Sequence, residues 1–210
     1  MSNILIVDDH AVVRAGLKQI ISDISGITAV DEADDAIEAL SKIREKEYSV
    51  VVLDISMPGK SGLDVLKEIR NEHPKLPVLM LSMHPEYQYA MRSLRSGAWG
   101  YVTKDSAPAE LAVAIRTVVG GRKYISSNLA EKLAFNLDVD MKKEPHEILS
   151  DREHQVLCMI ASGKTLTEIG DQLALSVKTI STYRGRILEK MQLRNNAEMI
   201  NYAIRNHLAA

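Results

Sequence analysis

The sequence lacks most of the features that mark secreted and membrane proteins. It has a single cysteine, Cys158, so no disulfide can form within the chain. No apolar run approaches the roughly 20 residues that a membrane-spanning helix requires. The N-terminal stretch has no basic residues and soon reaches Asp8 and Asp9, which argues against a signal peptide. These absences favour a cytoplasmic protein in a reducing compartment.

The net charge is small, −2, but one segment departs from this balance. The 210 residues are 46% hydrophobic and 26% charged, which is typical of one large or two small globular domains. Residues 177–194 contain five basic side chains and one acid, Glu189. Such a segment is typical of a surface that binds a polyanion, although a solvated helix face has the same composition.

In the first 120 residues, short apolar runs alternate with helical periodicity. The runs predict strands, and the periodic stretches between them predict helices. The predicted strands are 4–7, 29–32, 50–53, 78–81 and 99–102, and the predicted helices are about 12–23, 35–46, 63–72, 86–96 and 107–119. This alternation predicts an α/β doubly wound fold with a five-stranded parallel sheet and helices on both faces.

The rest of the chain predicts a linker and a small all-α domain. Residues 123–146 include a possible short helix, 126–137, and then a polar stretch broken by Pro145, which predicts a linker. Four helical segments follow in 147–210. Their predicted N-caps are Ser150, Thr165, Ser176 and Asn195.

Reactive side chains stand where the predicted strands end. Asp8, Asp9 and Asp54 follow two strands, Ser82 ends another, and Lys104 follows the last. Because parallel strands present their carboxyl ends at one sheet edge, we expect these groups to converge. Three close carboxylates repel one another unless a hard cation such as Mg²⁺ binds them. An aspartate can attack phosphorus, and a lysine, a hydroxyl and a metal can neutralise phosphoryl oxygens, so the set predicts a phosphoryl-accepting site.

Four motifs carry a resemblance to a known family: ILIVDDH (4–10), VLDISMPG (52–59), LS (81–82) and GYVTK (100–104). With them, residues 1–122 resemble the receiver domain of two-component systems, a flavodoxin-like fold. The resemblance implies that Asp54 accepts a phosphoryl group from a sensor histidine kinase.

The same resemblance implies roles for the surrounding residues. Mg²⁺, or another divalent cation, would bind Asp9, Asp54 and the backbone carbonyl of Ser56, with Asp8 in the acidic pocket. Ser82 and Lys104 would contact the phosphoryl group. Tyr101 would change rotamer on activation.

The last domain carries a second resemblance. Its motifs include LSDRE (149–153), IASG (160–163), SVKTI (176–180) and ILEKM (187–191). With them, residues 148–208 are similar to the LuxR-type helix-turn-helix, and the resemblance implies 166–174 as scaffold helix, 177–190 as recognition helix and 196–207 as a dimer helix. Together the two resemblances indicate a response regulator of the NarL/FixJ type. The predicted DNA-contacting side chains are Lys178, Thr179, Ser181, Thr182, Tyr183, Arg184, Arg186 and Lys190.

Alternatives stay open at this level. Considered without the others, an aspartate after a strand commonly caps a turn. Lys104 alone would be read as an ordinary surface lysine, and Tyr101 alone as a residue that packs in the core. An aspartyl-phosphate hydrolase has similar chemistry but places a second aspartate where this chain has Ser56. The helical domain alternatively binds RNA or protein. The six histidines show no ligand spacing, and Cys158 lies on an apolar helix face with no obvious base, as in a core.

The sequence as a whole therefore predicts a DNA-binding transcription regulator and not an enzyme. Phosphorylation would favour dimers that bind double-stranded promoter DNA, and no membrane is involved. Two features of the predicted recognition helix are unusual. Tyr183 stands where many members have histidine, and Gly185 lies inside the helix, where glycine costs about 1 kcal/mol relative to alanine.

Overall fold

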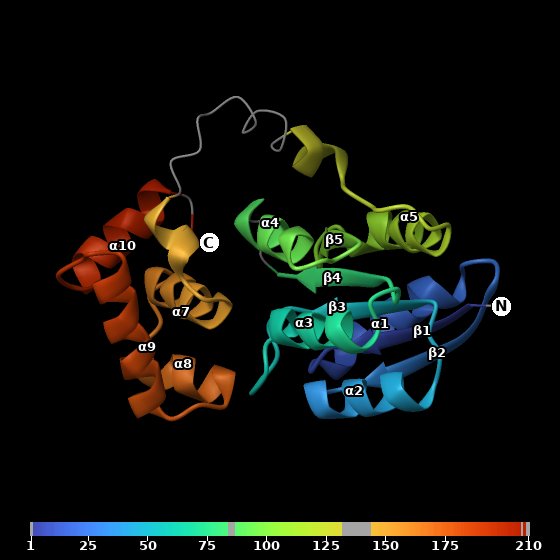
Figure 1. Cartoon of the computed structure of the whole chain (residues 1–210), viewed down its shortest axis with the longest axis horizontal. Helices are drawn as coiled ribbons and strands as arrows, with labels where there is room; N and C mark the ends of the chain where they lie inside the picture. The colour runs from blue at the N-terminus through green and yellow to red at the C-terminus, as the bar shows by residue number, and fades with distance from the viewer. Residues whose placement is uncertain (1, 84–86, 132–143, 207, 209–210) are drawn as a thin grey trace. The chain divides into compact units, whose positions relative to one another are not determined.

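The chain forms two compact units, Met1–Asp138 and Val139–Ala210. The computed structural model describes residues 2–83, 87–131, 144–206 and 208 (Figure 1). The junction between the units falls outside these residues, as do most of the predicted polar linker and the second half of the helix predicted at 126–137. Among the residues described, no helix is both long enough and apolar enough to cross a membrane.

The first unit is the predicted α/β fold. Its five parallel strands stand in the order β2-β1-β3-β4-β5, which confirms the predicted doubly wound sheet. The strands are β1 (Ser2–Val7), β2 (Ile27–Ala33), β3 (Val50–Asp54), β4 (Val78–Ser82) and β5 (Gly100–Thr103). The helices are α1 (Ala11–Ser22), α2 (Ala36–Glu45), α3 (Gly62–Glu72), α4 (Tyr87–Arg95) and α5 (Ala107–Val119).

Both faces of the sheet are covered, which explains why its central strands are apolar throughout. Every residue of β3 and β4 is buried. Alternate side chains, such as Val50 and Val52, pack in one cluster with Leu17 of α1 and Leu111 of α5. The remaining helices carry their own buried apolar faces, and α2 contacts α3. Two-sided burial fixes the strand ends in space.

Strand register brings the predicted site residues to one edge. Val7 pairs with Leu53, so Asp8 and Asp54 each lie one residue beyond this pair. Ser82 pairs with Thr103, and the backbone N–H of Lys104 donates to the carbonyl of Ser82 at 2.8 Å.

The chain after α5 continues along the sheet. Tyr124, in the stretch predicted as linker, donates its N–H to the carbonyl of Trp99 at 2.8 Å and forms a parallel bridge with Gly100. Its phenol donates to Glu110 at 3.1 Å. The first unit therefore extends at least to Tyr124.

The second unit is all-helical, as predicted. Its elements are the 3-10 helix η1 (Pro145–Ile148), α7 (Asp151–Ala161), α8 (Leu166–Leu173), α9 (Val177–Lys190) and α10 (Asn196–Arg205). Ser150 and Thr165 form complete capping boxes, and Ser176 and Asn195 each accept one backbone N–H, so all four predicted caps are confirmed. His146, also in the stretch predicted as linker, is buried in this unit and lies 2.7 Å from the Tyr202 hydroxyl.

Candidate functional site

A lysine bridges two buried carboxylates at the carboxyl edge of the sheet. Lys104 Nζ lies 2.6 Å from Asp8 Oδ2 and 2.9 Å from Asp54 Oδ2. All three side chains are nearly removed from solvent, with exposed fractions of 7% for Lys104 and 0–1% for the two acids. The strands that precede Asp54 and Ser82 are buried along their whole length, which fixes where they end.

Burial and charge act on Asp54 in opposite directions. Removal from water raises the pKa of Asp54, Lys104 lowers it, and Asp8 raises it again; the net pKa lies above the ordinary value. Burial alone would lower the pKa of Lys104, but the two carboxylates outweigh it and raise that pKa. Lys104 therefore stays protonated, and an ionised Asp54 is held at a free-energy cost.

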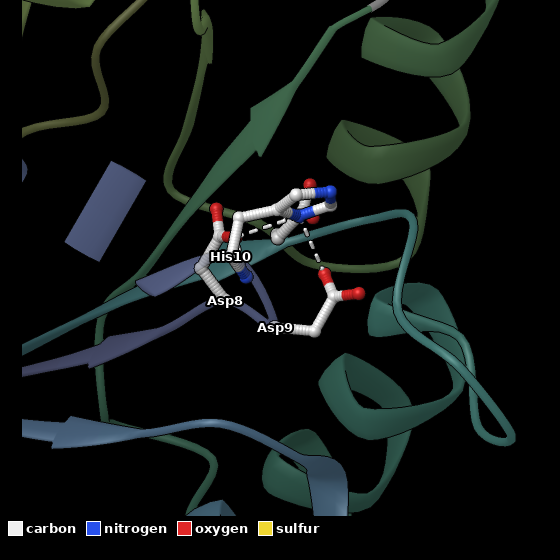
Figure 2. Close-up of side chains that lie close together, drawn as sticks. Asp8, Asp9 and His10 are labelled. Atoms are coloured by element: carbon white, nitrogen blue, oxygen red, sulfur yellow. Dashed lines mark hydrogen bonds and ion pairs between the residues drawn. The ribbon is translucent and has the colours of Figure 1, made fainter. Parts of the chain in front are cut away.

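His10 joins this cluster, so the expectation that no histidine has ligand spacing is wrong for this residue. Its Nδ1 lies 2.9 Å from Asp9 Oδ1 and 3.3 Å from Asp8 Oδ1 (Figure 2). One ligand atom from each of Asp8, Asp9, His10 and Asp54 lies within 4.8 Å of the others. Direct adjacency to the Asp8–Asp9 pair was the available signal, since these residues share the loop after β1.

The donor set suits a divalent cation. Asp54 Oδ1 is buried and has no hydrogen-bond partner among the residues described. An unpaired buried carboxylate oxygen is costly, and a cation between it and the neighbouring acids offsets that cost. Carboxylate oxygens with a solvent-accessible side are the ligands that Mg²⁺ prefers. Asp9 and His10 provide the more exposed side.

The backbone around Asp54 depends on a glycine that sequence reasoning missed. The N–H of Gly62 donates to the carbonyl of Ile55 at 2.9 Å, and a Cβ on Gly62 would lie 1.9 Å from the carbonyl oxygen of Asp54. Ser61 caps α3 by accepting from the N–H of Asp64 at 3.2 Å. The start of α3 therefore packs directly on the loop that follows Asp54.

The other predicted residues of this site lie nearby in the sheet. Ser82 is fully buried at the end of β4, and Tyr101 is buried in β5. Ser56 follows Asp54 by two residues and is partly exposed. Ser82 lies at the edge of the sheet where β4 ends.

In the second unit, α8 and α9 are joined by a tight turn. Ala174 adopts a left-handed conformation (φ 53°), and the N–H of Leu175 donates to the carbonyl of Gly170 at 2.8 Å. A Cβ on Gly170 would lie 2.8 Å from the carbonyl oxygen of Leu175. Gly170 therefore serves close packing, and the α8–turn–α9 unit has the form of a helix-turn-helix.

The predicted DNA-contacting residues divide into two groups. Four of them project from α9 into solvent: Lys178, Ser181, Thr182 and Arg186. The others make contacts inside the unit: Thr179 lies 2.8 Å from the capping Ser176, Arg184 donates to Asn196 at 2.5 Å, and Lys190 pairs with Glu153 at 2.6 Å; Tyr183 is partly buried.

Cys158 is buried, as expected of a core residue, but it has a neighbour that the sequence did not reveal. The Cys158 Sγ lies 3.7 Å from His154 Nδ1, one turn earlier in α7. The spacing of four residues on one helix was the signal.

Comparison with known proteins agrees with this geometry. Residues 4–116 match the response regulator receiver domain, and residues 147–203 match the bacterial regulatory proteins of the luxR family. The response regulator UvrY of Escherichia coli is 38% identical over 209 residues, which cover 99% of this chain and 96% of UvrY. The response regulator GacA of Pseudomonas syringae pv. syringae is 38% identical over 207 residues, which cover 98% of this chain and 97% of GacA.

Solved structures of RcsB have the same architecture. RcsB from Salmonella typhimurium is similar over 100% of this chain and 98% of its own, with a TM-score of 0.71 and 25% identity. A second structure is RcsB from Salmonella enterica serovar Typhimurium, bound to promoter rprA in the presence of the phosphomimetic BeF₃⁻. Its TM-score is 0.65 and its sequence identity is 28%, over 96% of this chain and 98% of the RcsB chain. The chain therefore belongs to the two-component response regulators of the NarL/FixJ type, with a receiver domain followed by a LuxR-type helix-turn-helix domain.

Proposed function

We propose that this transcription regulator is switched by phosphoryl transfer from a sensor histidine kinase to Asp54. The observation that carries the proposal is the buried Asp8–Lys104–Asp54 arrangement in a chain that also has a basic recognition helix. The receiver comprises residues 1–122 together with Tyr124, which packs on it, and the DNA-binding domain comprises residues 147–210 together with the buried His146, so the linker lies between these two residues. The matched ranges 4–116 and 147–203 support these bounds.

Asp54 is suited to act as the nucleophile. Its Oδ1 has no hydrogen-bond partner among the residues described, so this oxygen is available to attack phosphorus. Burial leaves the carboxylate poorly solvated and raises the pKa of Asp54. The phosphorus–nitrogen bond of the kinase phosphohistidine breaks, and a phosphorus–oxygen bond to Asp54 forms. Asp8, Asp9, Asp54 and the Ser56 carbonyl would hold Mg²⁺, which supplies positive charge opposite the phosphoryl oxygens when bound.

The switch consists of contacts that differ between the two states. Without phosphate, Lys104 bridges Asp8 and Asp54. A phosphoryl group on Asp54 gives Lys104 and Ser82 a new anionic partner, and Tyr101 in the adjacent strand repacks. A ligand shifts a two-state equilibrium only through such differential contacts. The receiver assists its own phosphorylation and dephosphorylation and has no separate substrate.

The output is binding of double-stranded DNA by dimers. RcsB structures contain DNA-bound dimers, and this chain has the same two domains. Exposed α9 side chains enter the major groove, and α10 contributes to the dimer, so half-sites lie about one helical turn apart or a multiple of it. A regulator that binds promoter DNA acts in the cytoplasm, which is the location proposed for this protein.

Phosphodonor labelling tests the acceptor. Acetyl phosphate with Mg²⁺ should label the wild type, whereas Asp54→Asn should remain unlabelled. Lys104→Ala should accept phosphate but gain no DNA affinity. Persistent labelling of Asp54→Asn would place the acceptor elsewhere, and a normal gain in Lys104→Ala would remove Lys104 from the switch.

Binding measured across salt concentrations tests the output. Filter binding should show a steep loss of duplex DNA affinity with salt, because α9 neutralises several phosphates. RNA of the same sequence should bind more weakly. Equal or tighter RNA binding would favour an RNA-binding output, and no binding to either would favour a protein partner.

A further inference from the structure

We propose that His10 makes the acidic pocket a binding site for a borderline divalent cation of the Zn²⁺ class. The imidazole nitrogen would act as a fourth ligand beside Asp8, Asp9 and Asp54. This inference rests on the proposed function, since it concerns the same pocket. It goes beyond that function by naming a second class of cation, chosen by a nitrogen ligand that a magnesium site does not need.

The four ligand atoms are already close together. They lie within 4.8 Å of one another, and His10 Nδ1 is 2.9 Å from Asp9 Oδ1. Zinc–ligand distances are about 2.0–2.2 Å for nitrogen and oxygen, so ligands around one ion stand about 3–4 Å apart. Only small side-chain adjustments separate the present arrangement from a coordination shell.

The backbone positions the His10 ring at this site. The His10 N–H donates to Asp8 Oδ1 at 2.8 Å, which ties the loop after β1 to one of the acids. His10 is the N-cap residue of α1, yet its side chain makes no capping hydrogen bond. The ring therefore has no role in helix capping. It lies instead beside Asp9, with 63% of the side chain exposed and accessible to an incoming ion (Figure 2).

An independent observation points to a ligand at this position. Asp54 Oδ1 is buried, with 1% of the Asp54 side chain exposed, and has no hydrogen-bond partner in the described part of the chain. Lys104 occupies the other oxygen of this carboxylate. This oxygen provides a buried acceptor in the same cluster as the more exposed His10.

The chemistry of the imidazole sets the selectivity. Mg²⁺ favours oxygen ligands and retained water, so His10 contributes little to its binding. Imidazole suits Zn²⁺ and related ions, whose affinities for nitrogen and oxygen sites exceed those of earlier divalent metals. Binding would place the ion between His10 Nδ1 and Asp9 Oδ1, which lie 2.9 Å apart.

A second pair of side chains that zinc commonly binds lies elsewhere in the chain, so zinc binding there must be distinguished from binding in this pocket. Cys158 and His154 lie 3.7 Å apart in α7, and both are buried. Among the residues described, this pair belongs to no group of three or more candidate ligands, and its burial restricts access to ions. A substitution at Cys158 therefore provides the matched control for zinc binding elsewhere in the chain.

Calorimetric titration of the metal-free full chain with Zn²⁺ alone and with Mg²⁺ alone tests the proposal. Wild type should bind Zn²⁺ at least about tenfold more tightly than Mg²⁺. His10→Ala should lose about tenfold or more in Zn²⁺ affinity and change Mg²⁺ affinity less than about twofold. Cys158→Ser should bind Zn²⁺ as the wild type does, and Asp9→Asn should weaken both ions.

Three results would overturn the proposal: unchanged Zn²⁺ affinity in His10→Ala, equal loss for both ions, or loss of Zn²⁺ binding in Cys158→Ser. His10→Asn keeps a residue type suited to the N-cap position, so it replaces His10→Ala if that variant unfolds. Acetyl phosphate labelling separates the two proposals. If Asp54 is labelled but Zn²⁺ binds no more tightly than Mg²⁺, only the proposed cation site is contradicted. If Zn²⁺ binds more tightly but Asp54 is not labelled, only the proposed function is contradicted.

Discussion

At the scale of single residues, the burial of Asp54 carries a cost in stability. Because burial raises its pKa, the folded state disfavours the ionised carboxylate. The folded state therefore loses stability as pH rises from the unfolded pKa, about 3.9, through the folded one. We expect Asp54→Asn to raise the free energy of unfolding of the metal-free receiver at pH 7 by about 1 kcal/mol or more.

Thermal unfolding followed by Trp99 fluorescence measures this effect, since Trp99 is the only tryptophan and packs on the receiver core. The two proteins should converge as pH falls toward about 4, where Asp54 of the wild type is protonated. Asp105→Asn removes an exposed carboxylate and should change stability little. A lower melting temperature for Asp54→Asn at pH 7 would show that the Lys104 pair outweighs burial.

At the scale of elements, the contact between α3 and the Asp54 loop depends on the absence of one side chain. A Cβ at position 62 would lie 1.9 Å from the carbonyl oxygen of Asp54. Relieving this clash would require a shift of the backbone, which costs more free energy than a shift of a flexible side chain. We expect Gly62→Ala to destabilise the receiver by about 1–3 kcal/mol and to slow phosphodonor labelling.

Gly16→Ala is the matched control for that change. Gly16 is exposed in the middle of α1, and a Cβ there would meet nothing within 4 Å. We expect it to stabilise the receiver by about 0.5–1 kcal/mol. Trp99 fluorescence in denaturant measures both variants, and effects of equal sign would contradict the steric explanation.

The start of α7 is held by a buried acid. Glu153 is buried, accepts from the N–H of Ser150 at 2.8 Å and pairs with Lys190 at 2.6 Å. Burial raises its pKa, but these hydrogen bonds outweigh burial and the net pKa is lowered. Its stabilising contribution is therefore present above the unfolded pKa, about 4.3, and is lost as pH falls through the folded value.

We expect Glu153→Gln to destabilise the second unit by about 1–2 kcal/mol at pH 7 and by much less below pH ~4. Far-UV circular dichroism during thermal unfolding follows this all-helical unit. Exposed Glu189→Gln is the control and should change stability little. If Glu153→Gln lowers the stability of the second unit by the same amount at every pH, the side chain stabilises the cap through its packing and not through its charge.

Local signals predicted the elements well, and long-range contacts explain what was missed. Continuous apolar runs such as 50–53 identify doubly buried strands, and capping residues such as Ser150 mark helix starts within a few positions. The clash at Gly62 involves a residue eight positions earlier, and no local pattern indicates it. Adjacency in the sequence indicates that His10 lies near Asp8 and Asp9, but its approach to Asp54 depends on how the loop after β1 turns.

At the scale of the whole molecule, the boundaries of the two units were harder to predict from the sequence than their cores. Tyr124 joins the first unit through backbone hydrogen bonds to β5, and His146 is buried in the second. Both lie in a stretch whose composition indicates a linker, because polar composition does not report which few residues pack.

Gly185 provides a test of which face of α9 meets DNA. It is exposed in mid-helix, and a Cβ there would meet nothing within 4 Å, so nothing in the described part of its own unit requires a glycine. It lies three and four residues after the exposed Thr182 and Ser181, on the same face. A glycine here lowers helix stability by about 1 kcal/mol and lets a partner approach the backbone closely.

We therefore expect Gly185→Ala to raise the thermal stability of the second unit and yet to weaken duplex DNA binding about tenfold, because the added methyl group holds α9 away from the groove. Fluorescence anisotropy with duplex DNA, alongside circular dichroism melts, measures both effects. Gly16→Ala, which places a methyl group on the receiver, should leave DNA affinity unchanged. Unchanged affinity in Gly185→Ala would exclude this face of α9 from close contact with DNA and would shift recognition toward the side that carries Arg186.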